Sequence, residues 1–208
     1  MRYVPLALIL TAALMLQAPA AHAMPMTFVG NLSGANEVPV VSPAGTGFTT
    51  VVLDPTAQTL QVNVMFSGLT SLTTAAHIHC CQPLGTNAGV ATTVPAFPGF
   101  PIVANGMGVT SGDYHSPVLS LLDAGTYNPA FVAMFPGLPQ AESALINGIE
   151  NGMSYLNVHT ANNTGGEIRS QLFPAPEPMS LVLLGSALVG FALMRHRKSA
   201  PSGDRATP

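Results

Sequence analysis

The segment 75–81 (AAHIHCC) holds the residues of this chain best suited to chemistry. It contains two of the six histidines and both cysteines of a 208-residue chain. Successive side chains of a β-strand point to opposite faces, so a strand here places His77 and His79 on one face and Ile78 on the other. A β-sandwich or barrel can present two imidazoles to one metal ion in this way.

The adjacent Cys80 and Cys81 are the second chemical feature of this segment, and three states are open to them. They can form a vicinal disulfide, bind a metal as thiolates beside the histidines, or remain as separate thiols that are inert or pair with another molecule. In an exported protein free thiols tend to be oxidised. A disulfide between neighbours closes a minimal loop and would stabilise the fold little.

The first 23 residues predict a secretory signal peptide. Arg2 precedes an apolar run over residues 4–16, and Ala21-His22-Ala23 gives the A-x-A pattern of a cleavage site. We therefore expect passage through the Sec export machinery and removal of residues 1–23 by signal peptidase.

Residues 174–208 predict a C-terminal sorting segment. Residues 179–194 carry no charge, and sixteen residues are marginal for a hydrocarbon core of ~30 Å. Arg195, Arg197 and Lys198 follow and would stay on the cytoplasmic side. We expect a transmembrane helix over 179–194, so that the chain is first exported and then held in the inner membrane by its tail.

The portion between these segments, residues 24–173, is acidic. It has one cation, Arg169, against seven aspartate and glutamate residues, a formal net charge of −6. Such a surface repels phosphate backbones, so we expect no nucleic-acid partner.

The same portion reads as short strands and turns around one helix. A long stretch over 82–112 is rich in Gly and Pro and predicts an irregular excursion. Alternation is clearest in two hairpins, 48–53 with 60–66 and 154–160 with 167–173. Further strands are expected at 28–32, 75–81 and 118–122, and a helix at 141–151. This pattern predicts an all-β domain, an antiparallel β-sandwich with one short helix.

The last predicted strand carries a charged pair but no sign of catalysis. Glu167 and Arg169 share one face and predict a local surface ion pair, which is worth at most ~1 kcal/mol. No nucleophile is evident near them, and we expect no catalytic residue in the chain.

Three motifs together resemble a known family: FVGNLSGANEVPVV at 28–41, TAAHIHCC at 74–81 and YLNVHTANNTGGEIRSQL at 155–172. The three motifs, occurring together in this order, resemble the CHRD domain. The resemblance spans roughly residues 27–173. The resemblance implies an immunoglobulin-like β-sandwich or barrel, distantly similar to copper/zinc superoxide dismutase. It implies no established biochemical activity.

The comparison with superoxide dismutase extends the candidate metal site to a third histidine. It places His77 and His79 at the H-x-H copper ligands and His159 near another copper histidine, which implies a copper or zinc site of three imidazoles. No His/His/Asp cluster follows for the zinc half, so superoxide dismutation does not carry over. The alternative is that the three histidines are hydrogen-bonded in a polar seam or partly exposed.

The tail resembles a PEP-CTERM sorting signal. Pro176, Glu177 and Pro178 precede the apolar run, and the basic residues follow it. This resemblance implies a Gram-negative exporter whose exosortase processes the tail, often in organisms that make exopolysaccharide. The tail departs from the pattern by continuing to Pro208 and by placing His196 inside the basic cluster.

These features lead to two expected functions of different classes. The first is an exported, tail-anchored or surface-sorted module of the cell envelope or extracellular matrix, non-enzymatic, with envelope proteins or polysaccharide as partners. The second is a copper- or zinc-binding envelope protein that uses His77, His79 and His159. An oxidoreductase is a weaker third, since it needs a redox metal with an open coordination position.

Overall fold

The computed structural model describes residues 24–176, 185–189 and 191, and the chain divides into two units between Pro174 and Ala175. The predicted signal peptide lies outside the described residues, as do most of the predicted span and the sorting residues from Glu177 onward. Within that span, residues 185–189 are helical. None of the helices described is long and apolar enough to cross a membrane.

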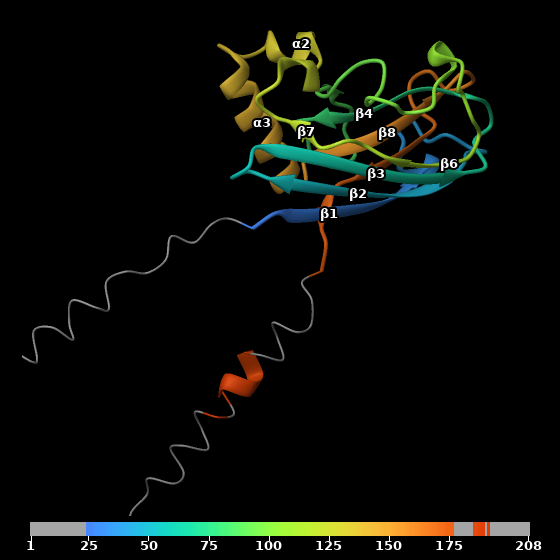
Figure 1. Cartoon of the computed structure of the whole chain (residues 1–208). Coiled ribbons are helices and arrows are strands. Elements are labelled where there is room, and N and C mark those ends of the chain that lie inside the picture. Colours follow the sequence, from blue (N-terminus) through green and yellow to red (C-terminus); the bar gives the residue numbers. More distant parts are fainter. Residues whose placement is uncertain (1–23, 177–184, 190, 192–208) are drawn as a thin grey trace, which may run out of the picture. The chain divides into compact units, whose positions relative to one another are not determined.

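The first unit is built around one curled antiparallel sheet. Its strand order is β5-β4-β8-β9-β1-β2-β3-β6, with β10 added beside β1 and β7 beside β3. The sheet curls into a half-barrel, so that β4 and β8 lie across from β2 and β3 (Figure 1). The strands are β1 (Met26–Ser33), β2 (Thr46–Asp54), β3 (Thr59–Ser67), β4 (Thr73–Cys80), β5 (Gly89–Val90), β6 (Gly112–His115), β7 (Leu119–Ser120), β8 (Ser154–Thr160), β9 (Ile168–Gln171) and β10 (Phe173–Pro174). The predicted all-β class is confirmed.

The helical elements are short except for one. The helices are η1 (Gly34–Asn36), η2 (Val103–Asn105), η3 (Ala124–Thr126), α2 (Pro129–Val132) and α3 (Leu138–Glu150). The predicted helix at 141–151 is α3, which begins earlier because Pro139 is well tolerated in a first helical turn. Its buried residues Ala141, Leu145 and Ile149 recur at helical spacing, which is why the helix could be read from the sequence.

The hairpin of β2 and β3 forms the regular wall of the core. Every second residue points inward, and Val51, Leu60 and Val62 have no exposed surface. The turn between the strands is closed by the Asp54 carboxylate, which accepts hydrogen bonds from the backbone N–H groups of Thr56 and Ala57. This hairpin confirms the prediction made from alternation.

The opposite wall, β4 and β8, is buried on both faces. Its inner face carries Ile78, Leu156 and Val158, all without exposed surface. Its outer face is polar and is covered by loops. The irregular stretch after β4 follows the edge of that strand, where the Ala91 N–H donates to the Ile78 carbonyl over 2.9 Å. The predicted excursion at 82–112 is therefore fixed against the sheet.

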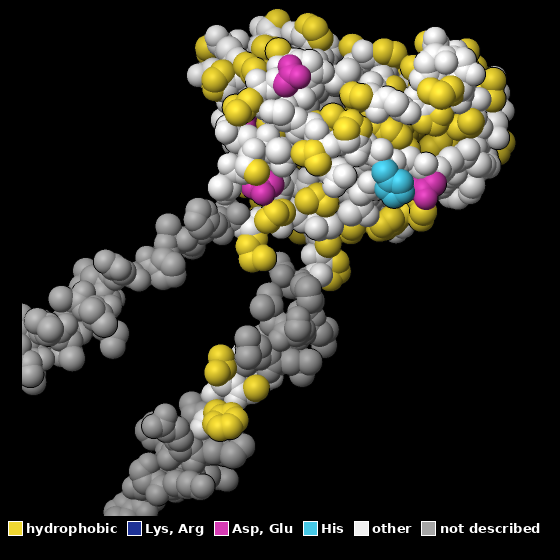
Figure 2. Space-filling view, in the orientation of Figure 1, with side chains coloured by type: hydrophobic (Ala, Val, Ile, Leu, Met, Phe, Trp, Pro, Cys, Tyr) yellow, Lys and Arg dark blue, Asp and Glu magenta, His cyan; other side chains and the backbone are white. Residues whose placement is uncertain are grey.

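The surface carries little charge. Figure 2 shows one face with scattered apolar and acidic side chains and no visible Lys or Arg. Arg169, the single cation of residues 24–173, is only 4% exposed. The described surface therefore has no basic patch that could attract a phosphate backbone.

Glu167 lies inside the molecule, so the predicted surface ion pair with Arg169 is wrong. Its carboxylate has no exposed surface and binds loops from three parts of the chain. It accepts hydrogen bonds from the backbone N–H groups of Gly45 and Thr70, the hydroxyls of Thr70 and Thr160, and the side-chain amide of Asn163. Glu167 does not pair with Arg169, although the two share a strand face, because neutral groups from other segments form its hydrogen bonds.

These hydrogen bonds set the ionisation of Glu167. Burial raises the pKa of this carboxyl, but the bonds from Thr160, Thr70 and Gly45 outweigh burial and leave its pKa below the ordinary value. A carboxyl with a lowered pKa stabilises the fold above the pKa of the unfolded chain. That contribution is lost as pH falls through the folded pKa.

We expect Glu167→Gln to lower the free energy of unfolding by about 2–3 kcal/mol at pH 7, because charge-assisted hydrogen bonds are lost. The buried NH₂ group of the new amide would also face the hydrogen-bond donors that surround the carboxylate. The difference from the wild type should shrink below pH 4, as measured by urea denaturation. Glu150→Gln, at an exposed position of α3, is the matched control and should change little. Equal losses for both variants, or a pH-independent difference, would contradict this role.

Candidate metal site

The structure brings His77, His79 and His159 together on the outer face of β4 and β8. The nitrogen atoms that could bind an ion all lie within 4.8 Å of one another. The ring centroids are 4.8 Å apart for His77 and His79, 4.6 Å for His77 and His159, and 5.9 Å for His79 and His159. Three side chains from two strands therefore converge on one point.

Strand register explains the convergence. β4 and β8 are antiparallel, with Ala75 opposite His159 and His77 opposite Asn157. Residues two apart on a strand share a face, and diagonal neighbours across a strand pair remain within reach of long side chains. His159 therefore lies diagonally across from His77 and extends the H-x-H pair into a triangle.

One nitrogen of each ring is occupied by a backbone carbonyl. The Nδ1 atoms of His77, His79 and His159 lie 3.2, 2.8 and 2.9 Å from the carbonyl oxygens of Pro95, Ala88 and Thr164. A carbonyl oxygen can only accept, so each Nδ1 carries the proton and each Nε2 keeps a lone pair. Such a hydrogen bond at the second nitrogen is typical of histidines that bind metals.

The three Nε2 atoms are the unusual feature of the site. All three are fully enclosed and have no hydrogen-bond partner. A buried acceptor without a partner costs about 1–3 kcal/mol. Three such acceptors aimed at a common point form a set of neutral nitrogen donors, which is the donor set preferred by copper and zinc.

The surroundings keep these rings neutral. Burial, followed by the neighbouring His159 and His79, lowers the pKa of His77 to about 3. Burial chiefly lowers the pKa of His79 to about 4, and burial also lowers the pKa of His159. At neutral pH the lone pairs are therefore free of protons and available to a cation.

The distances fit one ion after a small adjustment. Two nitrogens bound to the same zinc ion are at most ~4.2 Å apart, because each Zn–N bond is ~2.0–2.1 Å long. The nitrogens at the site lie within 4.8 Å of one another, so the widest separation is slightly above this limit. Side-chain rotations that move the nitrogens by less than about 1 Å bring all three within bonding distance.

Two further side chains border the histidines. The Tyr155 ring stacks on His79 with centroids 4.6 Å apart, and the Arg169 guanidinium lies 4.7 Å from the centroid of Tyr155 on its ring face. Asn157 has a buried Oδ1 without a partner and lies opposite His77 in the strand register. Asn157 therefore adds another buried, unpartnered oxygen on the same strand face as the histidines.

His115 does not belong to this cluster. It is exposed on β6, where its Nδ1 contacts the Asn63 side chain and its Nε2 lies 3.2 Å from Asp113. Among the described residues, His77, His79 and His159 form the one group of such side chains close enough to hold a metal.

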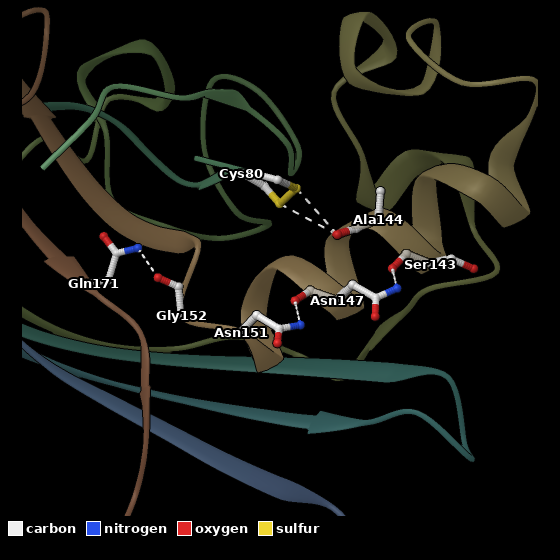
Figure 3. Close-up of a disulfide and its surroundings, with 8 residues drawn as sticks. Cys80, Ser143, Ala144, Asn147, Asn151, Gly152 and Gln171 are labelled. Atoms are coloured by element: carbon white, nitrogen blue, oxygen red, sulfur yellow. Dashed lines mark hydrogen bonds between the residues drawn. A yellow bond between two sulfur atoms is a disulfide. The ribbon is translucent and has the colours of Figure 1, made fainter. Parts of the chain in front are cut away.

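Cys80 and Cys81 are joined in a disulfide, so their sulfurs are not thiolate ligands. Both sulfurs lie beside the Ala144 carbonyl of α3, at 3.7 and 3.4 Å (Figure 3). A Cβ on Gly148, one turn further along the helix, would collide with both sulfurs. Since Cys80 follows His79 on the strand, the disulfide braces β4 against α3 on the face opposite the histidines.

The supporting groups of the site could not be found by residue type. Ala88, Pro95 and Thr164 act through backbone carbonyls, which every residue has. Tyr155 and Asn157 could be assigned to the face of His159 from alternation, although nothing in the sequence distinguished them as neighbours of a metal site. Their role follows from the antiparallel register of β4 and β8.

The depressed pKa values predict how the metal-free fold responds to acid. Below pH 6.5 the unfolded chain binds protons that His77 and His79 do not bind in the fold, so each removes up to about 1.4 kcal/mol of stability per pH unit. A His77→Gln/His79→Gln variant should lose less stability than the wild type between pH 6.5 and 4, in urea titrations with EDTA.

The measured quantity is the difference between variant and wild type, because Glu37 titrates in the same window with the opposite sign. Burial raises the pKa of Glu37 to about 7, against the effect of Arg169. Protonation of Glu37 therefore stabilises the fold as pH falls. His115→Gln should keep the wild-type slope. Parallel curves for wild type and double variant would refute the assignment of buried, neutral histidines.

Comparison with known proteins identifies the family of this fold and site. The CHRD domain profile matches residues 28–172, well over half of the chain and all of the sheet except the first two residues of β1 and strand β10. No curated protein and no solved structure matches the chain. The match includes the three histidines, the disulfide and Glu167, and on this ground the chain belongs to the CHRD domain family.

Proposed function

We propose that the protein is an exported CHRD module that binds one copper or zinc ion through His77, His79 and His159. The observation that carries the proposal is the set of three enclosed Nε2 atoms that face one another without hydrogen-bond partners. A polar seam of ordinary histidines would pair these atoms with donors, because buried acceptors are almost always satisfied. A cation satisfies all three at once.

The donor set favours these metals over others. No carboxylate belongs to the cluster, which disfavours calcium, magnesium and manganese. Three imidazoles with an additional small ligand are common for zinc and copper. The three histidines supply nitrogen ligands in an enclosed environment. Among the described residues, no nucleophile or general base accompanies them.

The role we propose is therefore binding and display in the envelope or matrix, without catalysis. CHRD domains occur in extracellular or secreted proteins. The disulfide of Cys80 and Cys81 suits an oxidising compartment outside the cytosol. Envelope proteins and exopolysaccharide are the partners that this placement would offer.

The sorting route is a second part of the proposal. We propose that the Sec machinery exports the chain of a Gram-negative bacterium, that the apolar run 179–194 anchors it in the inner membrane, and that an exosortase recognises Pro176, Glu177 and Pro178. The supporting feature is their order before an uncharged run that ends in Arg195, Arg197 and Lys198.

We expect the full chain, purified from periplasm and dialysed, to retain about one copper or zinc ion per molecule by mass spectrometry. His77→Ala, His79→Ala and His159→Ala should each weaken binding at least tenfold, because an imidazole ligand is lost. At a metal concentration of 100 Kd the wild type should gain about 2.7 kcal/mol of stability.

The matched control for these variants is His115→Ala, which removes an exposed histidine of the same domain. It should retain the metal and the thermal shift. Folded wild-type protein that takes up neither metal, or equal losses in His115→Ala and His159→Ala, would overturn the metal-binding function.

For the sorting route we expect alanine substitution of Pro176, Glu177 and Pro178 to hold the protein in the inner membrane of a host with an exosortase. The wild type should reach the surface or medium with a shorter chain. Alanine substitution of Pro201, Ser202 and Gly203, beyond the basic cluster, is the control and should leave sorting unchanged. Immunoblots of fractions measure the outcome, and normal release of the first variant would refute the route.

A further inference from the structure

A hollow lies on the outer side of β1 and β9. It is separate from the enclosed histidine nitrogens. It has a volume of 720 Å³, within the range of ~300–1,000 Å³ typical of small-molecule sites. Its rim is apolar, and each rim side chain is more than a third exposed. The rim residues are Val38, Val40, Phe48, Leu84 and Phe173. We refer to this hollow as the β1–β9 groove.

The floor of the β1–β9 groove contains a buried charge. Arg169 and Glu37 both line it, and their side chains are 5% and 4% exposed. Arg169 is the single cation between residues 24 and 173. A domain with a net charge of −6 thus places its one positive group at the base of an apolar hollow.

The guanidinium of Arg169 is held in place but incompletely paired. Its Nε donates to the Asn36 carbonyl over 2.5 Å and its Nη1 to the Asn87 side-chain oxygen over 2.7 Å. The Glu37 carboxylate lies 3.9 Å from Nε, which is beyond hydrogen-bond distance. Nη2 has no hydrogen-bond partner among the described residues. It differs from the histidine Nε2 atoms in that it is not fully enclosed.

Glu37 is the second unsatisfied group. Its Oε1 is fully enclosed and has no hydrogen-bond partner. Burial raises the pKa of Glu37 to about 7 despite the nearby Arg169, so near neutral pH a fraction of the molecules carries a protonated carboxyl. A protonated Glu37 carries no charge that would repel an anion beside Arg169.

We propose that the β1–β9 groove binds a small monocarboxylate with an apolar body. The carboxylate pairs with the free edge of the Arg169 guanidinium, which matches carboxylate geometry. The apolar body lies along Val38, Leu84 and Phe173. The proposal goes beyond metal binding and does not depend on it, because the groove is lined by none of the three histidines.

Charge selects this class of ligand over others. A phosphate ester carries up to two charges and would meet one arginine inside a strongly acidic domain. An ammonium compound would face the buried guanidinium. A neutral apolar molecule would fill the rim but leave Nη2 without a partner, and burying a charge without a partner is costly.

The test is a titration of hexanoate into the metal-free full chain with EDTA present, followed by ligand-observed NMR. EDTA removes any ion at the histidines, so a carboxylate cannot bind there, and the outcome is separate from that of the metal experiment. We expect saturable binding with a Kd of about 1 mM, and hexan-1-ol, which has no charge, to bind at least about tenfold more weakly.

Two exposed leucines give a matched pair of variants. Leu84→Ser, at the rim, should weaken hexanoate binding severalfold, whereas Leu122→Ser, which is exposed and not among the groove residues, should leave it unchanged. Arg169→Gln should weaken it at least tenfold, with folding checked by circular dichroism.

If Arg169→Gln does not fold, the leucine pair and the hexan-1-ol comparison decide the question. Equal binding of hexanoate and hexan-1-ol, equal effects of the two leucine variants, or no saturable binding up to 10 mM, about ten times the expected Kd, would overturn the proposal.

Discussion

The structure depends on one constraint: the strand pair of β4 and β8 has a polar face that is buried. A strand pair with one face on the core ordinarily exposes the other to water, which satisfies its polar groups. Here loops exclude the water, so protein atoms must replace it. Pro95, Ala88 and Thr164 provide carbonyls for one side of each histidine ring. The Nε2 atom on the other side of each ring has no partner among the described residues, and this division creates the candidate site.

Two buried charges hold the loops that make this possible. Glu167 binds Thr160 and Asn163, which begin the turn that carries the Thr164 carbonyl to His159. Arg169 binds Asn87, the neighbour of Ala88, and thereby fixes the loop that orients His79. Both charges come from one short segment, because Arg169 is in β9 and Glu167 immediately precedes that strand. The candidate metal site and the β1–β9 groove are thus two ends of one buried network, joined through the stack of Arg169, Tyr155 and His79.

Local patterns predicted those parts of the fold that local physics determines. The period of two fixed the hairpin of β2 and β3 and the common face of His77 and His79, since each depends on a few consecutive residues. The place of His159 came from a family resemblance, because the register between β4 and β8 is a contact between distant segments. The same limit explains the error at Glu167, where neighbours in sequence were paired although loops from elsewhere were the true partners. Carbonyl oxygens, finally, leave no signal in the sequence.

The irregular segment after β4 has a consequence for solubility. Its backbone occupies the edge of β4, with β5 and the contacts of Ala91 and Pro95 in place of a full neighbouring strand. An uncovered strand edge is a template for pairing with other chains, and natural proteins protect such edges. The loop that orients His77 and His79 is therefore also a guard against aggregation. Any change that opens this loop exposes the edge of β4 to other chains, so a ligand of the proposed site would have to enter without displacing that cover.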